Sequence, residues 1–75
     1  MWHSVKKEGL PPEGTECIVT VEFFDGTRSV YDSFKWAKGM WRYWSEQYED
    51  WEDMDEEADE QVVAWMPYPA LYEGE

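Results

Sequence analysis

The sequence predicts a mainly β fold in a single domain, a small antiparallel four-stranded meander with an acidic insertion before the last strand. Apolar residues alternate with polar ones in short runs rich in β-branched and aromatic side chains, which is typical of strands. Gly-containing turns separate the first three runs and favour hairpins between them. Six Trp, five Tyr and three Phe among 75 residues supply a dense core for so short a chain.

Residues 1–15 are expected to form an extended arm. Glycines and prolines interrupt this segment, and each disfavours a helix interior. They are Gly9, Pro11, Pro12 and Gly14. Trp2, Val5 and Leu10 are the apolar residues that would attach the arm to the core. His3 is the single histidine of the chain and is expected to pack in the arm, without a metal or acid–base role.

Residues 16–24 predict the first strand. Four alternate side chains form its expected core face, namely Cys17, Val19, Val21 and Phe23. Cys17 has no second cysteine as a disulfide partner and is interpreted as a buried free thiol. Asp25-Gly26 follows and is typical of a two-residue type I′ turn, because Gly adopts positive φ without steric cost. The chain is therefore expected to turn back on itself.

Residues 27–36 predict the second strand, although its apolar residues do not share one face. A bulge or bend near Asp32-Ser33 would reconcile the two faces. A tight turn over residues 37–39 leads into a third strand at Met40–Trp44, which completes a three-stranded meander over residues 16–44. The strand aromatics are interpreted mainly as core residues.

Residues 62–66 predict the last strand, which Pro67 ends. Because side chains alternate along a strand, Val63 and Trp65 are expected on one face of the sheet and Val62 on the other. Residues 67–75 form a tail.

Residues 45–61 form the acidic insertion. The fifteen residues 46–60 contain ten carboxylates and neither Lys nor Arg, and the whole chain carries a net charge of −12. Tyr48, Trp51 and Met54 repeat at helical spacing, so an amphipathic helix is one interpretation and would make the fold α+β. Six like-charged pairs four residues apart oppose this helix by about 1–3 kcal/mol, so a loop is the other interpretation.

Charge and hydropathy exclude several classes of protein. There is no run of 18 apolar residues and no charged-then-apolar leader, so neither a membrane span nor secretion is expected, and the cytoplasm is the expected location. Strong acidity disfavours direct binding to nucleic acid or to anionic membranes, because phosphate contacts need Lys and Arg. The expected partner is a basic protein.

No residue pattern predicts catalysis, a cofactor or a dedicated metal site. With 18 carboxylates any pair can be nominated for acid–base chemistry, so the pattern has no specificity. The glycines form no phosphate-binding motif. Alternating acids in the insertion resemble an EF-hand loop, but Ala58 and Ala64 stand where that loop needs Gly and Glu. A non-enzymatic binding protein is predicted, and loose association with divalent cations stays open.

Motifs at both ends of the chain carry a family resemblance. Trp2-His3-Ser4-Val5 is followed by a Leu-Pro and Gly turn over residues 10–14, and Ala64-Trp65-Met66-Pro67-Tyr68-Pro69 lies near the other end. These motifs resemble those of a family of small phage and prophage domains of unassigned function, which open with W-x-S-V and close with H-W-M-P-L-P. The resemblance implies a small β-rich protein of phage or prophage origin.

Two departures from the family pattern bear on function. Ala64 replaces the family's His, so any role of that His is absent. The connection before the last strand, short in the family, is here the long acidic insertion. Since binding functions tend to arise in loops held on a rigid sheet, the acidic segment is the first candidate for a function particular to this chain.

The most concrete hypothesis is a phage-encoded inhibitor of a basic, nucleic-acid-binding host defence complex, such as an anti-CRISPR protein, acting in the host cytoplasm. As a helix, the acidic segment would carry one charge per roughly 2.2 Å, near the one per about 1.7 Å of duplex DNA. The predicted partner-binding residues are Glu49, Asp50, Trp51, Glu52, Asp53, Asp55, Glu56, Glu57 and Asp59. Trp51 is either a buried anchor or an exposed contact. The alternative is a phage accessory or structural domain, oligomeric through its sheet edge, with an incidental acidic loop.

Overall fold

The computed structural model describes residues 1–54, 60–69, 72 and 74, which form one open antiparallel sheet. The elements are β1 (His3–Ser4), α1 (Val5–Glu8), β2 (Thr15–Phe23), β3 (Arg28–Ala37), β4 (Met40–Ser45), β5 (Asp50–Asp53) and β6 (Glu60–Pro67). Their order across the sheet is β1-β6-β2-β3-β4-β5. The mainly β prediction is confirmed. The prediction of a four-stranded meander is wrong, because the described residues form six strands.

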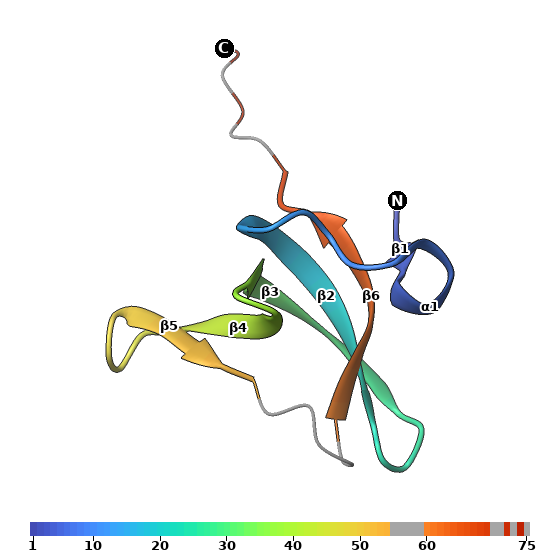
Figure 1. The fold of residues 1–75 in the computed structure, drawn as a ribbon. Coiled ribbons are helices and arrows are strands. Elements are labelled where there is room, and N and C mark those ends of the chain that lie inside the picture. The colour runs from blue at the N-terminus through green and yellow to red at the C-terminus, as the bar shows by residue number, and fades with distance from the viewer. Residues whose placement is uncertain (55–59, 70–71, 73, 75) are drawn as a thin grey trace.

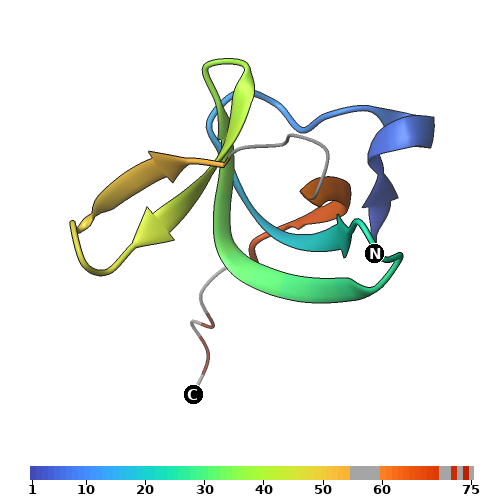
Figure 2. The same cartoon turned by 90° about the horizontal axis from the view of Figure 1, so that it is seen from below.

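The sheet is strongly curved. β4 and β5 form a hairpin that stands out at one end of the molecule, while β1 and α1 lie at the other end (Figures 1 and 2). β1 and β5 are the two edges of the sheet. Among the residues that the structure describes, no helix is long and apolar enough to span a membrane.

The N-terminal arm contributes an edge strand and a helical turn that the sequence did not predict. β1 pairs with β6, with His3 opposite Trp65. The Ser4 hydroxyl accepts a hydrogen bond from the Lys7 N–H at 3.3 Å, and the Glu8 carboxylate accepts one from the Ser4 N–H at 3.1 Å. Reciprocal capping of this kind satisfies backbone donors at a helix start. The prediction of a wholly extended arm is therefore wrong over α1, a short helix that is stabilised by its own caps.

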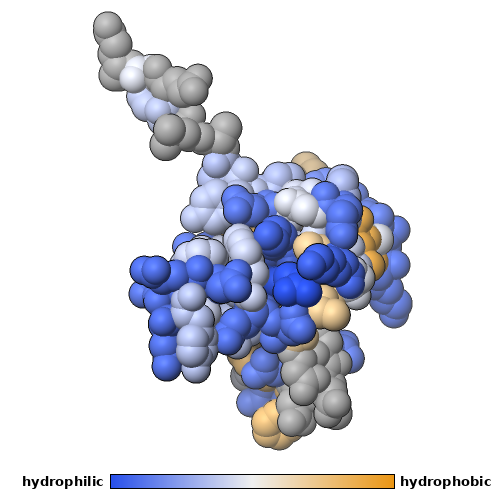
Figure 3. Space-filling model, turned by 60° about the vertical axis from the view of Figure 1, so that its left-hand side comes forward, coloured by the Kyte–Doolittle hydropathy of each residue, from blue (hydrophilic) through white to orange (hydrophobic). Residues whose placement is uncertain are grey.

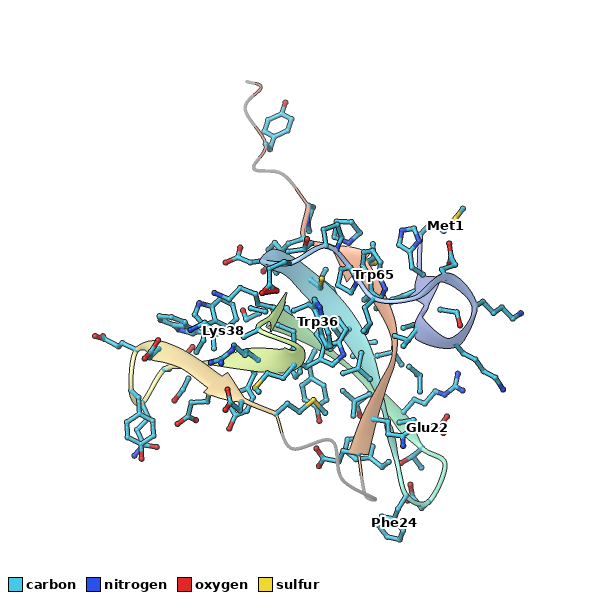
Figure 4. The ribbon with its side chains drawn as sticks, viewed as in Figure 1. Met1, Glu22, Phe24, Trp36, Lys38 and Trp65 are labelled. Atoms are coloured by element: carbon cyan, nitrogen blue, oxygen red, sulfur yellow. The ribbon has the colours of Figure 1, made fainter. Side chains whose placement is uncertain are left out.

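β2 lies near the middle of the sheet, and its predicted core face is confirmed. Cys17, Val19 and Val21 are at most 1% exposed, and the partly exposed Phe23 packs against them. β6 and β3 flank β2 on either side. The buried cluster comprises Cys17, Val19, Val21, Phe34, Trp41, Val62 and Trp65. Trp36 packs against this cluster (Figure 4). The interpretation of strand aromatics as core is therefore confirmed for Trp36 and Trp41 and is wrong for Trp44 and Tyr43, which are 40% and 37% exposed.

The β2–β3 turn differs from the predicted two-residue turn. The Gly26 N–H donates to the Phe23 carbonyl at 2.9 Å and the Phe23 N–H to the Thr27 carbonyl at 2.8 Å, which leaves a three-residue loop. Gly26 has φ +87°, whereas Asp25 is not among the residues with positive φ that a type I′ turn would need. The Asp25 carboxylate instead accepts the Thr27 N–H and hydroxyl, which favours the longer loop. The two-residue turn with two positive φ values lies between β3 and β4, at Lys38-Gly39.

Two bulges decide which side chains reach the core. The pairing of β2 with β3 shifts opposite Asp32-Ser33, where Ser33 has φ +57°, so the predicted bulge is confirmed. A second shift places Val21 opposite Val62 while the preceding Thr20 lies opposite Ala64. This extra residue in β6 turns both Val62 and Trp65 inward, at 4% and 9% exposed. The prediction that these two side chains face opposite sides is wrong for this reason.

The acidic insertion does not form one continuous helix. Residues 46–49 make a turn, Asp50–Asp53 form β5, and Glu60 and Gln61 already belong to β6. The helical interpretation is therefore wrong for 46–54, and residues 55–59 lie outside the described part of the chain. A strand sends neighbouring carboxylates to opposite faces, whereas a helix would stack them four residues apart.

Candidate interaction site on the β4–β5 hairpin

The hairpin of β4 and β5 has two chemically different faces. Arg42 lies opposite Asp53 and Trp44 opposite Trp51. These four side chains, with Lys35 of the neighbouring β3, form what we call the outer face. The alternate residues Tyr43 and Glu52 point to the other side, the core-side face, as the buried Trp41 does.

The outer face is held together by rings and charges. The Trp44 and Trp51 ring centroids are 5.6 Å apart at an interplanar angle of 74°, an edge-to-face pair. The Lys35 Nζ lies 4.4 Å from the centroid of the Trp51 ring, a cation–π contact. The Arg42 guanidinium binds the Asp53 carboxylate at 2.9 Å. Trp51 therefore anchors β5 against β4 while remaining partly exposed.

The core-side face carries a carboxylate–phenol contact. The Tyr43 hydroxyl donates to the Glu52 carboxylate at 3.2 Å. This hydrogen bond, and the negative charge of Glu52 behind it, raise the pKa of Tyr43 above its ordinary value, since ionisation would set two anions side by side. Tyr43 remains a neutral donor at physiological pH.

The turn of the hairpin and the start of β5 carry three exposed acids. Glu46, Glu49 and Asp50 are exposed, and none of them forms an ion pair within the described chain. The Asp50 carboxylate accepts the Trp51 N–H at 2.8 Å, which satisfies one backbone donor of the edge strand. Figure 3 shows that the surface brought forward on this side of the molecule is largely hydrophilic.

The structure places only part of the predicted partner-binding set. Glu49, Asp50, Trp51, Glu52 and Asp53 lie together in the hairpin. They do not form one row, because β5 sends Trp51 and Asp53 to the outer face and Asp50 and Glu52 away from it. Asp53 is neutralised by Arg42. The remaining predicted residues, Asp55, Glu56, Glu57 and Asp59, fall outside the described residues.

Sequence reasoning missed two concave sites beside the hairpin. The larger, of about 510 Å³, is lined by Val21, Tyr31, Asp32, Ser33, Phe34, Tyr43, Trp44, Glu46, Met54 and Glu60. The smaller, of about 240 Å³, is lined by Glu16, Ser33, Trp44, Trp51 and Tyr68. Both bring together residues from distant strands, and no local pattern in the sequence signals that proximity.

The groups that most often carry catalysis have structural roles here. Cys17 is fully buried, and desolvation raises the pKa of its thiol to about 11, so it stays protonated and unreactive at neutral pH. His3 stacks on Trp65 with ring centroids 4.5 Å apart and lies 3.2 Å from the Glu8 carboxylate. The predicted packing of His3 in the arm is confirmed. Within the described residues, no three His, Cys, Asp or Glu side chains are grouped to hold a metal ion.

The fold and the site define a class: a small antiparallel β protein that presents an acidic, aromatic hairpin at one end of an open sheet. Comparison of the chain with protein-family models, with curated proteins and with solved structures finds no match.

Proposed function

We propose that the protein is a phage-encoded, non-enzymatic inhibitor that uses its acidic hairpin to occupy a basic nucleic-acid-binding groove on a host defence complex. The observation that supports this proposal is the position of the exposed carboxylates of Glu46, Glu49 and Asp50 at the end of a hairpin that stands out from the sheet (Figure 1). The proposal of a phage origin rests on the resemblance of the terminal motifs to those of phage domains. An anti-CRISPR protein is one member of this functional class.

The electrostatics favour a basic partner. The chain has a net charge of −12, and two of its six cations, Arg28 and Arg42, are already paired with Glu22 and Asp53. The carboxylates of the hairpin turn are therefore not neutralised by these two arginines, and their negative electrostatic field can act on a partner. A field of this kind accelerates association by roughly 10- to 1000-fold at low ionic strength.

The strand geometry changes what the hairpin would imitate. A strand rises about 3.3 Å per residue, so Asp50 and Glu52, the two carboxylates of β5 that share a face and form no ion pair in the described part of the chain, lie roughly 6.6 Å apart along the strand. This spacing is wider than that of DNA phosphates, but nearer to the one per about 3.4 Å of one strand than to the one per about 1.7 Å of a duplex. The hairpin thus fits a groove for single-stranded nucleic acid better than one for a duplex.

A competition assay with two matched variants tests the proposal. The double variant Glu46→Gln/Glu49→Gln removes two charges from the hairpin turn, and Glu13→Gln/Glu22→Gln removes two charges that line neither recess beside the hairpin. The amide introduced at position 13 keeps an oxygen acceptor for the Lys38 N–H, which Glu13 binds in the native chain. Displacement of fluorescent single-stranded DNA from purified CRISPR effector complexes would be measured between about 50 and 200 mM salt.

We expect the native protein to displace the DNA, with an affinity that falls steeply as salt rises. The hairpin variant should bind about tenfold more weakly than the control variant, although both carry the same net charge. Equal inhibition by the two variants, or displacement that ignores salt, would refute the proposed use of the hairpin.

A second candidate function is an oligomeric phage accessory domain. The observation that favours it is the open sheet, whose edges β1 and β5 each have one neighbour in the described structure. Such edges are templates for pairing with another chain. Light scattering after gel filtration separates the two candidates: a concentration-independent monomer excludes assembly through the edges, whereas a stable oligomer with no DNA displacement supports the accessory role.

A further inference from the structure

The smaller recess lies on the same side of the sheet as the outer face of the hairpin. Glu16 of β2 pairs with Lys35 of β3, and Lys35 pairs with Arg42 of β4, so these side chains share that face. The Tyr68 N–H donates to the Glu16 carbonyl at 3.0 Å, which brings Tyr68 to the rim. The recess thus combines two indole rings, one phenol and one carboxylate.

This composition is chemically specific. Trp and Tyr rings attract cations through the negative potential of their faces, whereas their edges are positive. Trp44 and Trp51 are close to perpendicular, at 74°, so their faces point in different directions and a cation in the recess can stack on one face at a time. Glu16 is exposed and forms no ion pair within the described residues, so its carboxylate is available to a ligand in the recess. A ligand with positive charge and a flat body fits this lining best.

The molecule itself shows that one of these rings binds a cation. The Lys35 ammonium lies 4.4 Å from the Trp51 centroid. Lys35 does not line the recess, so its ammonium does not fill it. The Trp51 ring therefore already makes, with Lys35 of the same chain, the cation–π contact that the recess would offer to an external cation.

We propose that this recess binds the guanidinium group of an arginine side chain. Its volume of about 240 Å³ is below the roughly 300–1,000 Å³ of sites for whole small molecules, which points to a single side chain. A guanidinium stacks flat on an indole and donates two parallel hydrogen bonds to one carboxylate, here that of Glu16. The inference rests on the proposed function for the source of the arginine, which is the basic partner protein.

Titration of the free protein with N-acetyl-arginine amide tests this assignment without any partner. The neutral isostere N-acetyl-citrulline amide and N-acetyl-lysine amide serve as comparison probes at matched ionic strength. Binding is followed through the indole N–H signals in ¹H–¹⁵N NMR spectra. The Trp44 and Trp51 signals should move and saturate, whereas the Trp65 signal is an internal reference, because its N–H donates to the Gly9 carbonyl at 3.0 Å in the core.

We expect arginine amide to bind about threefold or more tightly than lysine amide, and citrulline amide to leave the spectrum unchanged. Glu16→Gln should weaken arginine binding about tenfold, as the loss of a charge-assisted hydrogen bond predicts. Glu46→Gln removes the same charge from a residue that does not line the recess, and should change the affinity less than about twofold. Trp51→Leu tests the ring, with circular dichroism to confirm that the variant is folded.

Two outcomes would overturn the assignment. Equal weakening by Glu16→Gln and Glu46→Gln would show diffuse attraction to an acidic protein, and equal binding of arginine and lysine amides would remove the guanidinium specificity. Failure here is distinct from failure of the proposed function. If the protein displaces DNA in a salt-dependent way but does not bind arginine amide, the inhibitor proposal stands. The recess then has no role in the inhibition.

Discussion

The Arg42–Asp53 pair yields a prediction in which the two partners respond unequally to removal. The Arg42 side chain is 21% exposed and its Nε atom is buried without a hydrogen-bond partner, whereas the Asp53 side chain is 60% exposed. Replacing Arg42 with Met keeps most of the apolar stem. It removes an ion pair that, at this exposure, contributes only about 0.2–1 kcal/mol, together with an unsatisfied buried donor that costs about 1–3 kcal/mol.

The cost of the unsatisfied donor is the larger of the two, so Arg42→Met should leave the free energy of unfolding unchanged or raise it by up to about 3 kcal/mol. Asp53→Asn should be the more harmful change, by about 1–2 kcal/mol, because it leaves a largely buried guanidinium without its anion. Urea denaturation followed by Trp fluorescence measures both, and the double variant gives the coupling energy. A loss of more than about 2 kcal/mol in Arg42→Met, or a reversed order of the two variants, would refute the reasoning.

Three further outcomes can be checked. Trp65→Phe should lower stability by about 1–3 kcal/mol in thermal unfolding, because it removes the indole donor to the Gly9 carbonyl and part of the core volume. Glu52→Gln should lower the pKa of Tyr43 towards its ordinary value in an ultraviolet absorbance titration, since both the ionic hydrogen bond and the charge that raise it are lost. Burial raises the Cys17 thiol pKa from 9.0 to about 11, so the folded state holds its proton longer, and the stability from this group should fall as pH rises from about 9 to 11.

The parts of the fold that the sequence predicted well are those governed by local alternation. The core face of β2 could be predicted because Cys17, Val19 and Val21 occupy alternate positions of one uninterrupted strand. The bulge at Asp32-Ser33 could be inferred because apolar residues change face at that point of β3. Both are properties of a few consecutive residues.

The features of the fold that the sequence did not predict depend on pairing with strands that are distant in the chain. The bulge that turns Val62 inward is fixed by the pairing of β6 with β2, and nothing in the residues around Val62 records it. β1 is two residues long and exists because β6 leaves its far edge open to His3 and Ser4. Strands this short have no periodicity that a sequence pattern can reveal.

The helical interpretation of the acidic segment was wrong for a different reason. The spacing of Trp51 and Met54 fits a helix, but in the structure Trp51 meets Trp44 across the hairpin and the Met54 N–H donates to the Trp41 carbonyl. Those long-range contacts outweigh the helical spacing, and a strand also separates the like charges. The recess could not be foreseen, because Glu16 at the start of β2 and Tyr68 just after β6 are far in the sequence from Trp44 and Trp51.

The carboxylates of β5 have a structural consequence that bears on the choice between the two candidate functions. An edge strand with free backbone groups invites pairing with a second copy, and charged side chains are a common protection against it. A second β5 would set Asp50, Glu52 and Asp53 against the same charges, and like charges directly opposite each other destabilise a strand pair. The Asp50 carboxylate also occupies the Trp51 N–H. Self-association through β5 is thus opposed by the same groups that would attract a cationic strand or groove, which favours the inhibitor over the oligomeric accessory domain.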